Sequence, residues 1–232
     1  IEEIAKIIKA KNPNTIFHVD AIQAYGKLPI VPKNMGIDLL STSGHKIHGP
    51  KGIGFLYIKE GTKISPIIFG GGQQKGMRSG TENVPGIVGL AVACEKMIGK
   101  NYENAEKIRE VKEYFQERIK EIEDIKDNSG KAPHVASISF KKLRSEVLLH
   151  ALEDREIYVS SGSACSSNKK QAVSGTLNAI ALSDEFKDGT LRFSFSIENT
   201  KEEVDETIKA LKELVPMLRR SVSYTHLTLP TT

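Results

Sequence analysis

The chain has no long hydrophobic run. Within its 232 residues, no apolar stretch approaches the roughly 20 residues that a helix needs to cross a bilayer. The first residues, from Ile1 to Asn12, also lack the basic-then-apolar order of a signal peptide. We therefore expect a cytoplasmic protein that does not bind a membrane.

Cysteine is scarce, and no zinc-binding or nucleic-acid-binding pattern is present. Only two cysteines occur, Cys94 in an apolar helical pattern and Cys165 in a turn of glycine and serine, which disfavours a disulfide between them. Together with scattered histidines they give no zinc-ligand spacing. The 33 Lys and Arg residues exceed the 29 Asp and Glu residues without forming a basic arm. A reducing compartment is expected, and nucleic-acid binding is not.

Two glycine-rich segments miss the spacing of nucleotide-binding loops. Gly44 and Gly49 have the separation of a P-loop, but Pro50 stands where the phosphate-binding lysine is required. The glycines at 70–72 and Gly76 do not fit GxGxxG. A P-loop and a dinucleotide site are both excluded.

The composition nevertheless suits a folded core, because 39% of residues are hydrophobic and 27% are charged. In the first half, apolar runs of strand length between Gly and Pro predict strands buried on both faces, as in an α/β layer. These runs lie at 15–20, 37–43 and 53–59. Helices are predicted over Ile1 to Lys11, from the spacing of its isoleucines, and after the stretch 70–80, with Pro85 in the first turn.

The second half predicts a compact α+β unit. Apolar residues at helical spacing from about Asn101 to Ile125 predict a long amphipathic helix that links two domains. Alternating or apolar patterns predict strands at 134–140, 157–161 and 190–196, and helices at 145–156 and 201–218. The last twelve residues, 221–232, carry no acidic residue, lysine or arginine, so we interpret them as an artefactual tail without function.

Asp20 ends one expected strand, and Lys46 lies in the turn after another. In open α/β sheets, ligands bind at the carboxyl ends of strands. A lysine amine attacks an aldehyde only when it is neutral and partly desolvated, and a pyridine nitrogen stays protonated only opposite a carboxylate. Asp20 and Lys46 supply that pair. The alternative is that Asp20 caps its own turn and Lys46 is a solvated loop lysine.

Four segments in order, HVDAIQ, SGHKIHGPKG, GGGQQKGMRSGTEN and SSGSACSS, decide between these readings. They resemble the cysteine desulfurases of the nitrogen-fixation and iron–sulfur-assembly type, within the class-V aminotransferase family, and the resemblance runs from Ile1 to Arg219. It implies a homodimer that uses pyridoxal 5′-phosphate (PLP) to convert L-cysteine into L-alanine. The sulfur would pass to an iron–sulfur scaffold or another sulfur-acceptor protein.

The resemblance implies a fold-type I α/β enzyme. Residues 1–98 would be the C-terminal part of the large, mostly parallel PLP-binding domain, and residues 99–220 the small α+β domain with the cysteine loop. Members of the family place a phosphate-binding loop, a histidine that stacks on the cofactor and a cofactor-binding asparagine in a part that would precede Ile1. We therefore expect this chain to begin within the large domain.

For the cofactor, the resemblance makes Lys46 the lysine that binds PLP covalently, Asp20 the partner of the pyridinium nitrogen and Gln23 a donor to the ring hydroxyl. Ser43 and His45 would contact the phosphate, and Lys46 or His45 would move protons during catalysis. Ordinary turn hydrogen bonding is the alternative for Ser43 and His45.

For the substrate and the partner subunit, three further residues are implied. Thr81 would reach the phosphate in the neighbouring subunit, with a plain helix N-cap as its alternative. Arg192 would pair with the substrate carboxylate, with a water-facing strand arginine as its alternative. Cys165 would attack the substrate sulfur as a thiolate and carry the persulfide, through which it is also the candidate transient iron–sulfur contact. A small buried hydrophobe is the alternative for Cys165, and Cys94 fits that reading.

Two other functions stay open. Another class-V enzyme, such as a selenocysteine lyase or an aminotransferase, would share Lys46 and Asp20, but the small-residue setting of Cys165 argues against it. The chain could instead be an inactive fragment that only dimerises or binds a partner.

Overall fold

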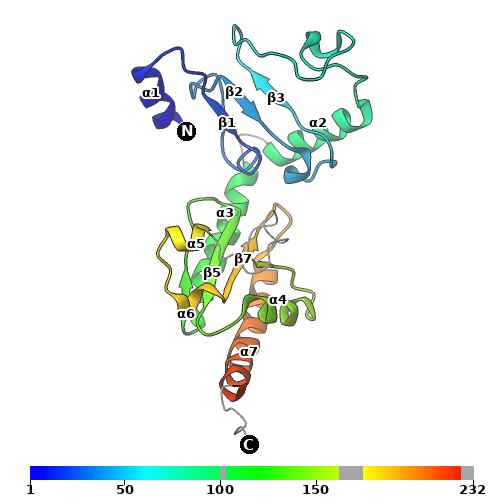
Figure 1. The fold of residues 1–232 in the computed structure, drawn as a ribbon. Helices are drawn as coiled ribbons and strands as arrows, with labels where there is room; N and C mark the ends of the chain where they lie inside the picture. The colour runs from blue at the N-terminus through cyan, green and yellow to red at the C-terminus, as the bar shows by residue number, and fades with distance from the viewer. Residues whose placement is uncertain (100–102, 162–174, 226–232) are drawn as a thin grey trace, which may run out of the picture. The chain divides into compact units, whose positions relative to one another are not determined.

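A computed structural model describes residues 1–99, 103–161 and 175–225. The chain divides into two compact units, Ile1–Ala105 and Glu106–Thr232, called unit 1 and unit 2 below. Each unit has its own sheet (Figure 1). Each also has buried hydrophobic side chains of its own. None of the described helices has both the length and the apolar composition needed to cross a membrane.

Unit 1 is built on a three-stranded mixed sheet. The strands are β1 (His18–Asp20), β2 (Leu39–Ser41) and β3 (Leu56–Ile58), in the order β1-β2-β3. β1 and β2 are parallel, and β3 is antiparallel to β2. The three expected strands are confirmed in place but are shorter than their apolar runs. The expected burial on both faces is wrong for this sheet, because His18, Asp20 and Leu56 are exposed.

Two α-helices and two short 3-10 helices complete unit 1. They are α1 (Glu2–Lys11), η1 (Gly44–Ile47), η2 (Gln73–Gly76) and α2 (Val84–Ile98). α1 begins after Ile1 without a side-chain cap, whereas α2 begins at Asn83, whose side chain accepts a hydrogen bond from the Gly86 N–H at 3.1 Å. Pro85 lies in the first turn of α2, as expected, where its missing N–H costs no helical hydrogen bond.

Unit 2 contains a fully antiparallel sheet with the order β4-β5-β7-β6. Its strands are β4 (Ile125–Asp127), β5 (Val135–Phe140), β6 (Ser160–Ser161) and β7 (Thr190–Ser194). Its helices are α3 (Glu103–Arg118), which begins in unit 1, η3 (Ile119–Glu121), α4 (Ser145–Glu153), α5 (Gly175–Ala179), α6 (Asp184–Lys187) and α7 (Lys201–Thr225). The expected α+β organisation of this half is confirmed.

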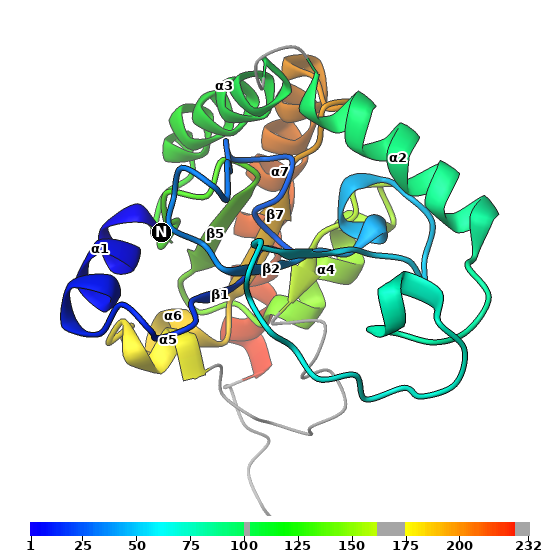
Figure 2. The same cartoon turned by 90° about the horizontal axis from the view of Figure 1, so that it is seen from above.

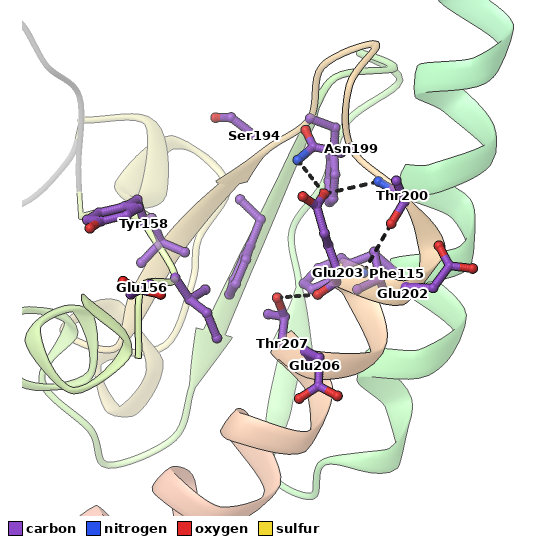
Figure 3. Close-up of a pocket in the computed structure, with 15 residues that line it drawn as sticks. Phe115, Glu156, Tyr158, Ser194, Asn199, Thr200, Glu202, Glu203, Glu206 and Thr207 are labelled. Atoms are coloured by element: carbon purple, nitrogen blue, oxygen red, sulfur yellow. Dashed lines mark hydrogen bonds between the residues drawn. The ribbon is translucent and has the colours of Figure 1, made fainter. Parts of the chain in front are cut away.

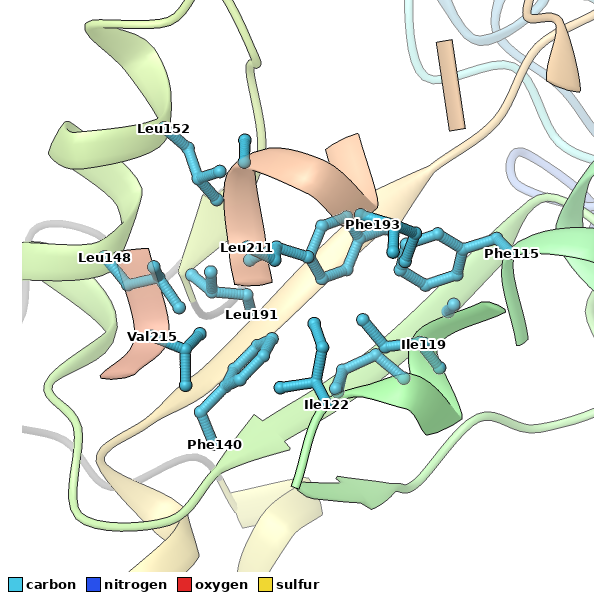
Figure 4. Close-up of a cluster of buried hydrophobic side chains, with 14 of the residues drawn as sticks. Phe115, Ile119, Ile122, Phe140, Leu148, Leu152, Leu191, Phe193, Leu211 and Val215 are labelled. Carbon is cyan, nitrogen blue, oxygen red and sulfur yellow. The ribbon is translucent and has the colours of Figure 1, made fainter. Parts of the chain in front are cut away.

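The core of unit 2 forms between its sheet and three helices. Figure 4 shows side chains of α3, α4 and α7 converging on Phe140, Leu191 and Phe193 of the central strands. Leu191 and Phe193 alternate with Arg192, so Arg192 lies on the opposite face of β7. The core therefore fixes the face on which Arg192 is presented.

The helix expected from about Asn101 to Ile125 is too long. α3 ends at Arg118, η3 follows, and Ile125 already belongs to β4. Asp124, between them, has a left-handed φ of 53°, which no regular helix contains. Ile119 and Ile122 are buried in the same cluster as α3, so the apolar spacing continues although the helix has stopped.

Candidate active site

The carboxyl ends of β1 and β2 lie at one edge of the unit 1 sheet. Because the strands are parallel, Asp20 pairs in register with Ser41, and the Ala21 N–H donates to the Ser41 carbonyl at 2.9 Å. The segment from Ser43 to Ile47 follows β2 directly. The structure thus brings Asp20 and the turn of Lys46 to the same edge.

Asp20 and Gln23 are exposed at this edge. Asp20 Oδ1 accepts a hydrogen bond from the Ile22 N–H at 3.0 Å, which is the local turn interaction that was the alternative to cofactor binding. Its Oδ2 atom accepts no hydrogen bond from the described residues. Asp20 therefore stabilises its turn and keeps one carboxylate oxygen open to a ligand.

Lys46 lies within η1, a 3-10 turn with Ser43 at its N-cap position. The Ser43 hydroxyl is hydrogen-bonded to His45 Nδ1 at 2.7 Å. This bond is the ordinary turn hydrogen bonding that was the alternative to phosphate contact for both residues. Lys46 is half-buried, and its amine makes no hydrogen bond or ion pair within the part of the chain that the structure describes. A half-buried amine without a partner is available for covalent chemistry.

The backbone of this turn is held on both sides. The Gly44 N–H donates to the Ile53 carbonyl at 2.8 Å, and the Gly49 N–H donates to the Gly44 carbonyl at 2.9 Å. A Cβ on Gly44 would lie 2.9 Å from the Pro50 carbonyl oxygen, so glycine permits the close approach. Ile47 is buried and anchors the end of the turn.

Lys27 is a residue of this site that sequence reasoning missed. Only 6% of Lys27 is exposed, and its Nζ donates to the Lys46 carbonyl at 2.8 Å. Burial, with a further contribution from the charge of Lys46, lowers the pKa of Lys27 to about 8. In the sequence, Lys27 stands in a Gly-Lys-Leu-Pro loop that gives no signal of burial.

The glycine-rich segment lies between β3 and α2 and is the cyan-to-teal stretch of Figure 2. Ser79 Oγ donates to the Gly71 carbonyl at 2.6 Å, and Arg78 Nη1 donates to the Ser79 carbonyl at 2.9 Å. Thr81 is exposed and stands two residues before Asn83, which is the N-cap of α2. The alternative that Thr81 is a plain N-cap is therefore wrong.

Arg192 belongs to unit 2. In the sheet it lies between Ser137 of β5 and Ser160 of β6, and its Nη2 donates to the Ser160 hydroxyl at 3.1 Å. Its Nε is buried and has no hydrogen-bond partner among the described residues. A buried guanidinium nitrogen without an acceptor is costly, so this atom favours an anionic ligand.

The two cysteines differ in what the structure describes. Cys165 lies outside the described residues. Cys94 is a free thiol on α2 and is half-buried, so it is less enclosed than a core hydrophobe. The described residues contain no group of three or more side chains that could hold a metal ion.

A separate cleft of about 560 Å³ lies in unit 2, where the ends of β7 and α7 approach the segment before β6 (Figure 3). Its lining includes the aromatic residues Phe115, Tyr158, Phe193 and Phe195 and the acidic residues Glu156, Glu202, Glu203 and Glu206. Glu203 accepts hydrogen bonds from Asn199 and from the Thr200 N–H, each at 3.0 Å. None of the expected site residues lines this cleft, so it is not part of the predicted cofactor site.

Comparison with known proteins places this geometry in a family. The family model described as Aminotransferase class-V matches residues 1–207. The cysteine desulfurase IscS of Dictyoglomus turgidum is 39% identical over 228 residues, covering 97% of this chain and 57% of the relative. A cysteine desulfurase of Nostoc sp. is 40% identical over 223 residues, covering 94% of this chain and 55% of the relative. The chain thus spans about half the length of these relatives.

Solved structures agree with these relatives. The structure of a NifS-like protein matches with a TM-score of 0.83 at 35% identity. The match covers 94% of this chain and 57% of the NifS-like chain. The structure of a cysteine desulfurase of Thermococcus onnurineus matches with a TM-score of 0.79 at 28% identity. The match covers 94% of this chain and 56% of the Thermococcus chain. These likenesses confirm the expected fold-type I architecture. From its family match and its relatives, this chain belongs to the aminotransferase class-V family, whose enzymes depend on PLP.

Proposed function

We propose that the protein to which this chain belongs is a PLP-dependent cysteine desulfurase that converts L-cysteine into L-alanine. The observation that carries the proposal is the half-buried amine of Lys46, without a partner among the described residues, in the turn at the sheet edge where β1 ends in Asp20. The names of its relatives support the choice of reaction. A cytoplasmic location belongs to the same proposal.

The residues at the sheet edge fit PLP chemically. Lys46 would hold the cofactor covalently, the open oxygen of Asp20 would face the pyridinium nitrogen, and Gln23 would donate to the ring hydroxyl. Ser43 and His45 would exchange their mutual hydrogen bond for contacts to the phosphate. When bound, PLP supplies an electron-withdrawing ring that stabilises negative charge at the substrate α-carbon.

Arg192 and Cys165 would act on the substrate. The open Nε of Arg192 and its neighbouring N–H groups would bind the cysteine carboxylate. Lys46 or His45 would take the α-proton. The Cys165 thiolate would then attack the substrate sulfur, forming an S–S bond while the C–S bond breaks and leaves its electron pair on carbon. Two protons would complete alanine: one added to the carbon that lost sulfur, equal to the proton released when the Cys165 thiol ionises, and one returned by the base to the α-carbon.

The persulfide on Cys165 would pass its outer sulfur to an iron–sulfur scaffold or another acceptor protein. Contact of Cys165 with iron would be confined to that transfer. This part of the proposal rests on the relatives and on the small residues around Cys165 in the sequence.

A homodimer is proposed from α2 and from Thr81 in the segment before it. Val84, Ile87, Val88 and Val92 are all exposed and recur at helical spacing, which makes one apolar face on α2. An apolar helix face of this kind favours a protein partner. Because Thr81 lies only three residues before Val84, a second copy docked there would bring Thr81 towards the phosphate of the other subunit.

The dimer is tested by sedimentation velocity. Val88→Lys places a charge in the apolar face of α2 and is expected to shift the chain towards monomer. Lys33→Glu, an exposed loop substitution, is the control and should leave the mass unchanged. Equal masses for all three proteins would argue against this face.

Cofactor attachment is tested by adding PLP to the purified chain and reducing it with borohydride. We expect a visible absorbance band before reduction and, after it, a modified lysine that peptide mass spectrometry locates at Lys46. Lys46→Ala should lose the modification, whereas Lys51→Ala, an exposed lysine of the following loop, should keep it. Modification spread evenly over surface lysines would contradict the proposed site.

The reaction is tested with Cys165→Ala, with Cys94→Ala as the matched control. A desulfurase loses sulfide release from L-cysteine in Cys165→Ala while Lys46 still binds the cofactor, and Cys94→Ala stays active. If turnover persists in Cys165→Ala, another class-V activity replaces the proposal. If Lys46 is unmodified and no protein releases sulfide, the chain is a fragment that only dimerises or binds a partner.

A further inference from the structure

Lys27 is buried at a position where no acidic residue neutralises it. Only 6% of the residue is exposed, and none of the described carboxylates forms an ion pair with it. Burying an ammonium group disfavours its charged form, and the nearby charge of Lys46 adds to the effect. A lysine kept in such an environment needs a compensating interaction.

That interaction is a hydrogen bond to the backbone of Lys46. Lys27 Nζ lies 2.8 Å from the Lys46 carbonyl oxygen, and the two residues are 19 positions apart in the chain. Carbonyls near the end of a short 3-10 helix have no partner within that helix. A hydrogen bond from an ammonium group to such a carbonyl is stronger than one from a neutral donor.

The Lys46 N–H donates to the Ser43 carbonyl at 3.2 Å, and Lys27 adds a side-chain hydrogen bond at the Lys46 carbonyl. Gly44 is fixed through its N–H to the Ile53 carbonyl, and Ile47 is fixed by burial. His48, which follows, takes a left-handed φ of 62° and so reverses the chain. Lys46 lies between these points, and Lys27 is the side chain that holds its peptide group.

Lys112 shows how a buried lysine acts when it only ties loops together. It is 5% exposed, and its Nζ donates to the carbonyls of Gly130 and Ala132, both at 2.8 Å. Its pKa is also lowered, with burial as the largest cause. The nearby charges of Asp127 and Glu113 oppose that lowering, unlike the charge of Lys46 near Lys27. Like Lys27, Lys112 is buried and donates to backbone carbonyls, but it bonds residues of unit 2 that carry none of the proposed reaction.

We infer that Lys27 is a positioning residue for Lys46: its buried Nζ holds the Lys46 peptide group and so sets where the Lys46 amine emerges at the sheet edge. The inference rests on the proposed function for the role of that amine in cofactor binding. The hydrogen bond itself does not depend on the cofactor.

The first test measures the reactivity of the Lys46 amine without cofactor. The chain is labelled with a trace of acetic anhydride, and peptide mass spectrometry gives the labelling rate of Lys46 relative to the exposed Lys33. Lys27→Met should change this ratio by about two- to tenfold, the range that corresponds to losing one hydrogen bond. Lys112→Met controls for removal of a buried lysine and should leave the ratio unchanged. An unchanged ratio in folded Lys27→Met would overturn the inference.

The second test uses only the wild-type chain, so it does not depend on whether a variant folds. In the wild-type chain, the ¹³C resonance of the Lys46 carbonyl is followed by NMR as Lys27 loses its proton. We expect an inflection near pH 8, where burial and the charge of Lys46 place the pKa of Lys27. The ¹⁵Nζ resonance of Lys27 should share that midpoint. A Lys46 carbonyl that does not respond to the Lys27 titration would also overturn the inference.

Failure of the proposed function gives a different result. If PLP and borohydride leave Lys46 unmodified in the wild-type chain, cofactor binding by this chain is wrong. The labelling ratio and the carbonyl titration would still report whether Lys27 positions Lys46. If cofactor attaches, Lys27→Met should attach less than Lys112→Met at the same PLP concentration, and Lys27→Arg, which retains a donor, should recover part of the loss.

Discussion

Asp38 is the buried carboxylate that joins three segments of unit 1. Its Oδ2 accepts from Lys9 Nζ of α1 at 2.5 Å and from the Phe17 N–H at 2.8 Å, and its Oδ1 accepts from Lys59 Nζ at 3.3 Å. Burial alone would raise the pKa of Asp38, but the hydrogen bonds from Lys9, Phe17 and Lys59 outweigh it and lower the pKa. This carboxylate therefore stabilises unit 1 in its charged form.

Replacing Asp38 by Asn should destabilise unit 1 by about 1–3 kcal/mol at pH 7, because Lys9, Lys59 and the Phe17 N–H lose a buried, charged acceptor. Since the folded pKa of Asp38 is lowered, its contribution is present above the unfolded value of 3.8 and is lost as the pH falls through the folded value. The difference between wild type and Asp38→Asn should thus shrink in acid. Urea unfolding at several pH values measures it.

The exposed acidic residue Glu60 provides the control for this experiment. Glu60→Gln removes a nearby charge without removing a buried acceptor, so it should change the unfolding free energy little at any pH. A constant difference between wild type and Asp38→Asn from pH 7 down to strong acid would show that the charge of Asp38 is not what stabilises the unit.

Single residues also show which parts of the candidate site the sequence predicts and which parts it does not. Asp20, Ser43, His45 and Lys46 could be predicted because each lies in a short segment whose neighbours define it. The pairing of Lys27 with Lys46 could not, because it joins residues 19 positions apart through a side chain and a carbonyl. Neither periodicity nor a local motif encodes such a contact.

At the scale of elements, apolar spacing predicted position better than length. α2, β5 and β7 were expected where the structure has them, whereas only Ser160 and Ser161 of the strand expected at 157–161 form β6. The spacing could not show that α3 stops at Arg118, because Ile119 and Ile122 return to the same core without continuing the α-helix. α5, α6 and β4 were missed because each is short.

The approach of Gly54 to the end of β2 is the tightest glycine contact in unit 1. A Cβ at this position would lie 2.3 Å from the Thr42 carbonyl oxygen, so the two segments must separate to admit it. Gly54→Ala should destabilise unit 1 by about 1–3 kcal/mol, as overpacking does. Because Thr42 precedes Ser43, the turn of Lys46 should move as well. Thermal unfolding and the amide spectrum of that turn measure both effects.

Gly72→Ala is the matched control. Nothing lies within 4 Å of a Cβ built on Gly72, and its φ of −83° suits any residue. Its effect on unfolding should be within about 0.5 kcal/mol, as at ordinary surface positions. If Gly54→Ala and Gly72→Ala unfold alike, the β2 end is more adaptable than its geometry implies.

For the whole molecule, the two units differ in how much core they have. The buried cluster of unit 2 draws on α3, α4, α7 and the central strands. Among the described residues, unit 1 has fewer buried hydrophobic side chains, and they are divided between the sheet, with Ile30, Ile37 and Leu40, and the α2 side, with Ile47, Leu90 and Met97. Apolar burial is the main stabilising contribution in folding, so the two units should differ in stability. The fold class could be predicted from the sequence, but this imbalance could not, because it depends on which apolar residues are covered.

We expect unit 1 to unfold at a lower urea concentration than unit 2. Hydrogen exchange followed by mass spectrometry at increasing urea reads the two units separately through peptides from β2 and β5. A single shared transition for both peptides would contradict the expectation and would mean that the units unfold cooperatively.

Dimerisation through the apolar face of α2, as proposed, would make the stability of unit 1 depend on the protein concentration. Val84, Ile87, Val88 and Val92 are covered only when another surface binds them, and binding to the folded state draws the unfolding equilibrium towards it. By mass action, a dilute sample and a concentrated sample of the same sequence would then melt at different temperatures. With that dimer, a melting temperature of this protein would have meaning only together with the concentration at which it was measured.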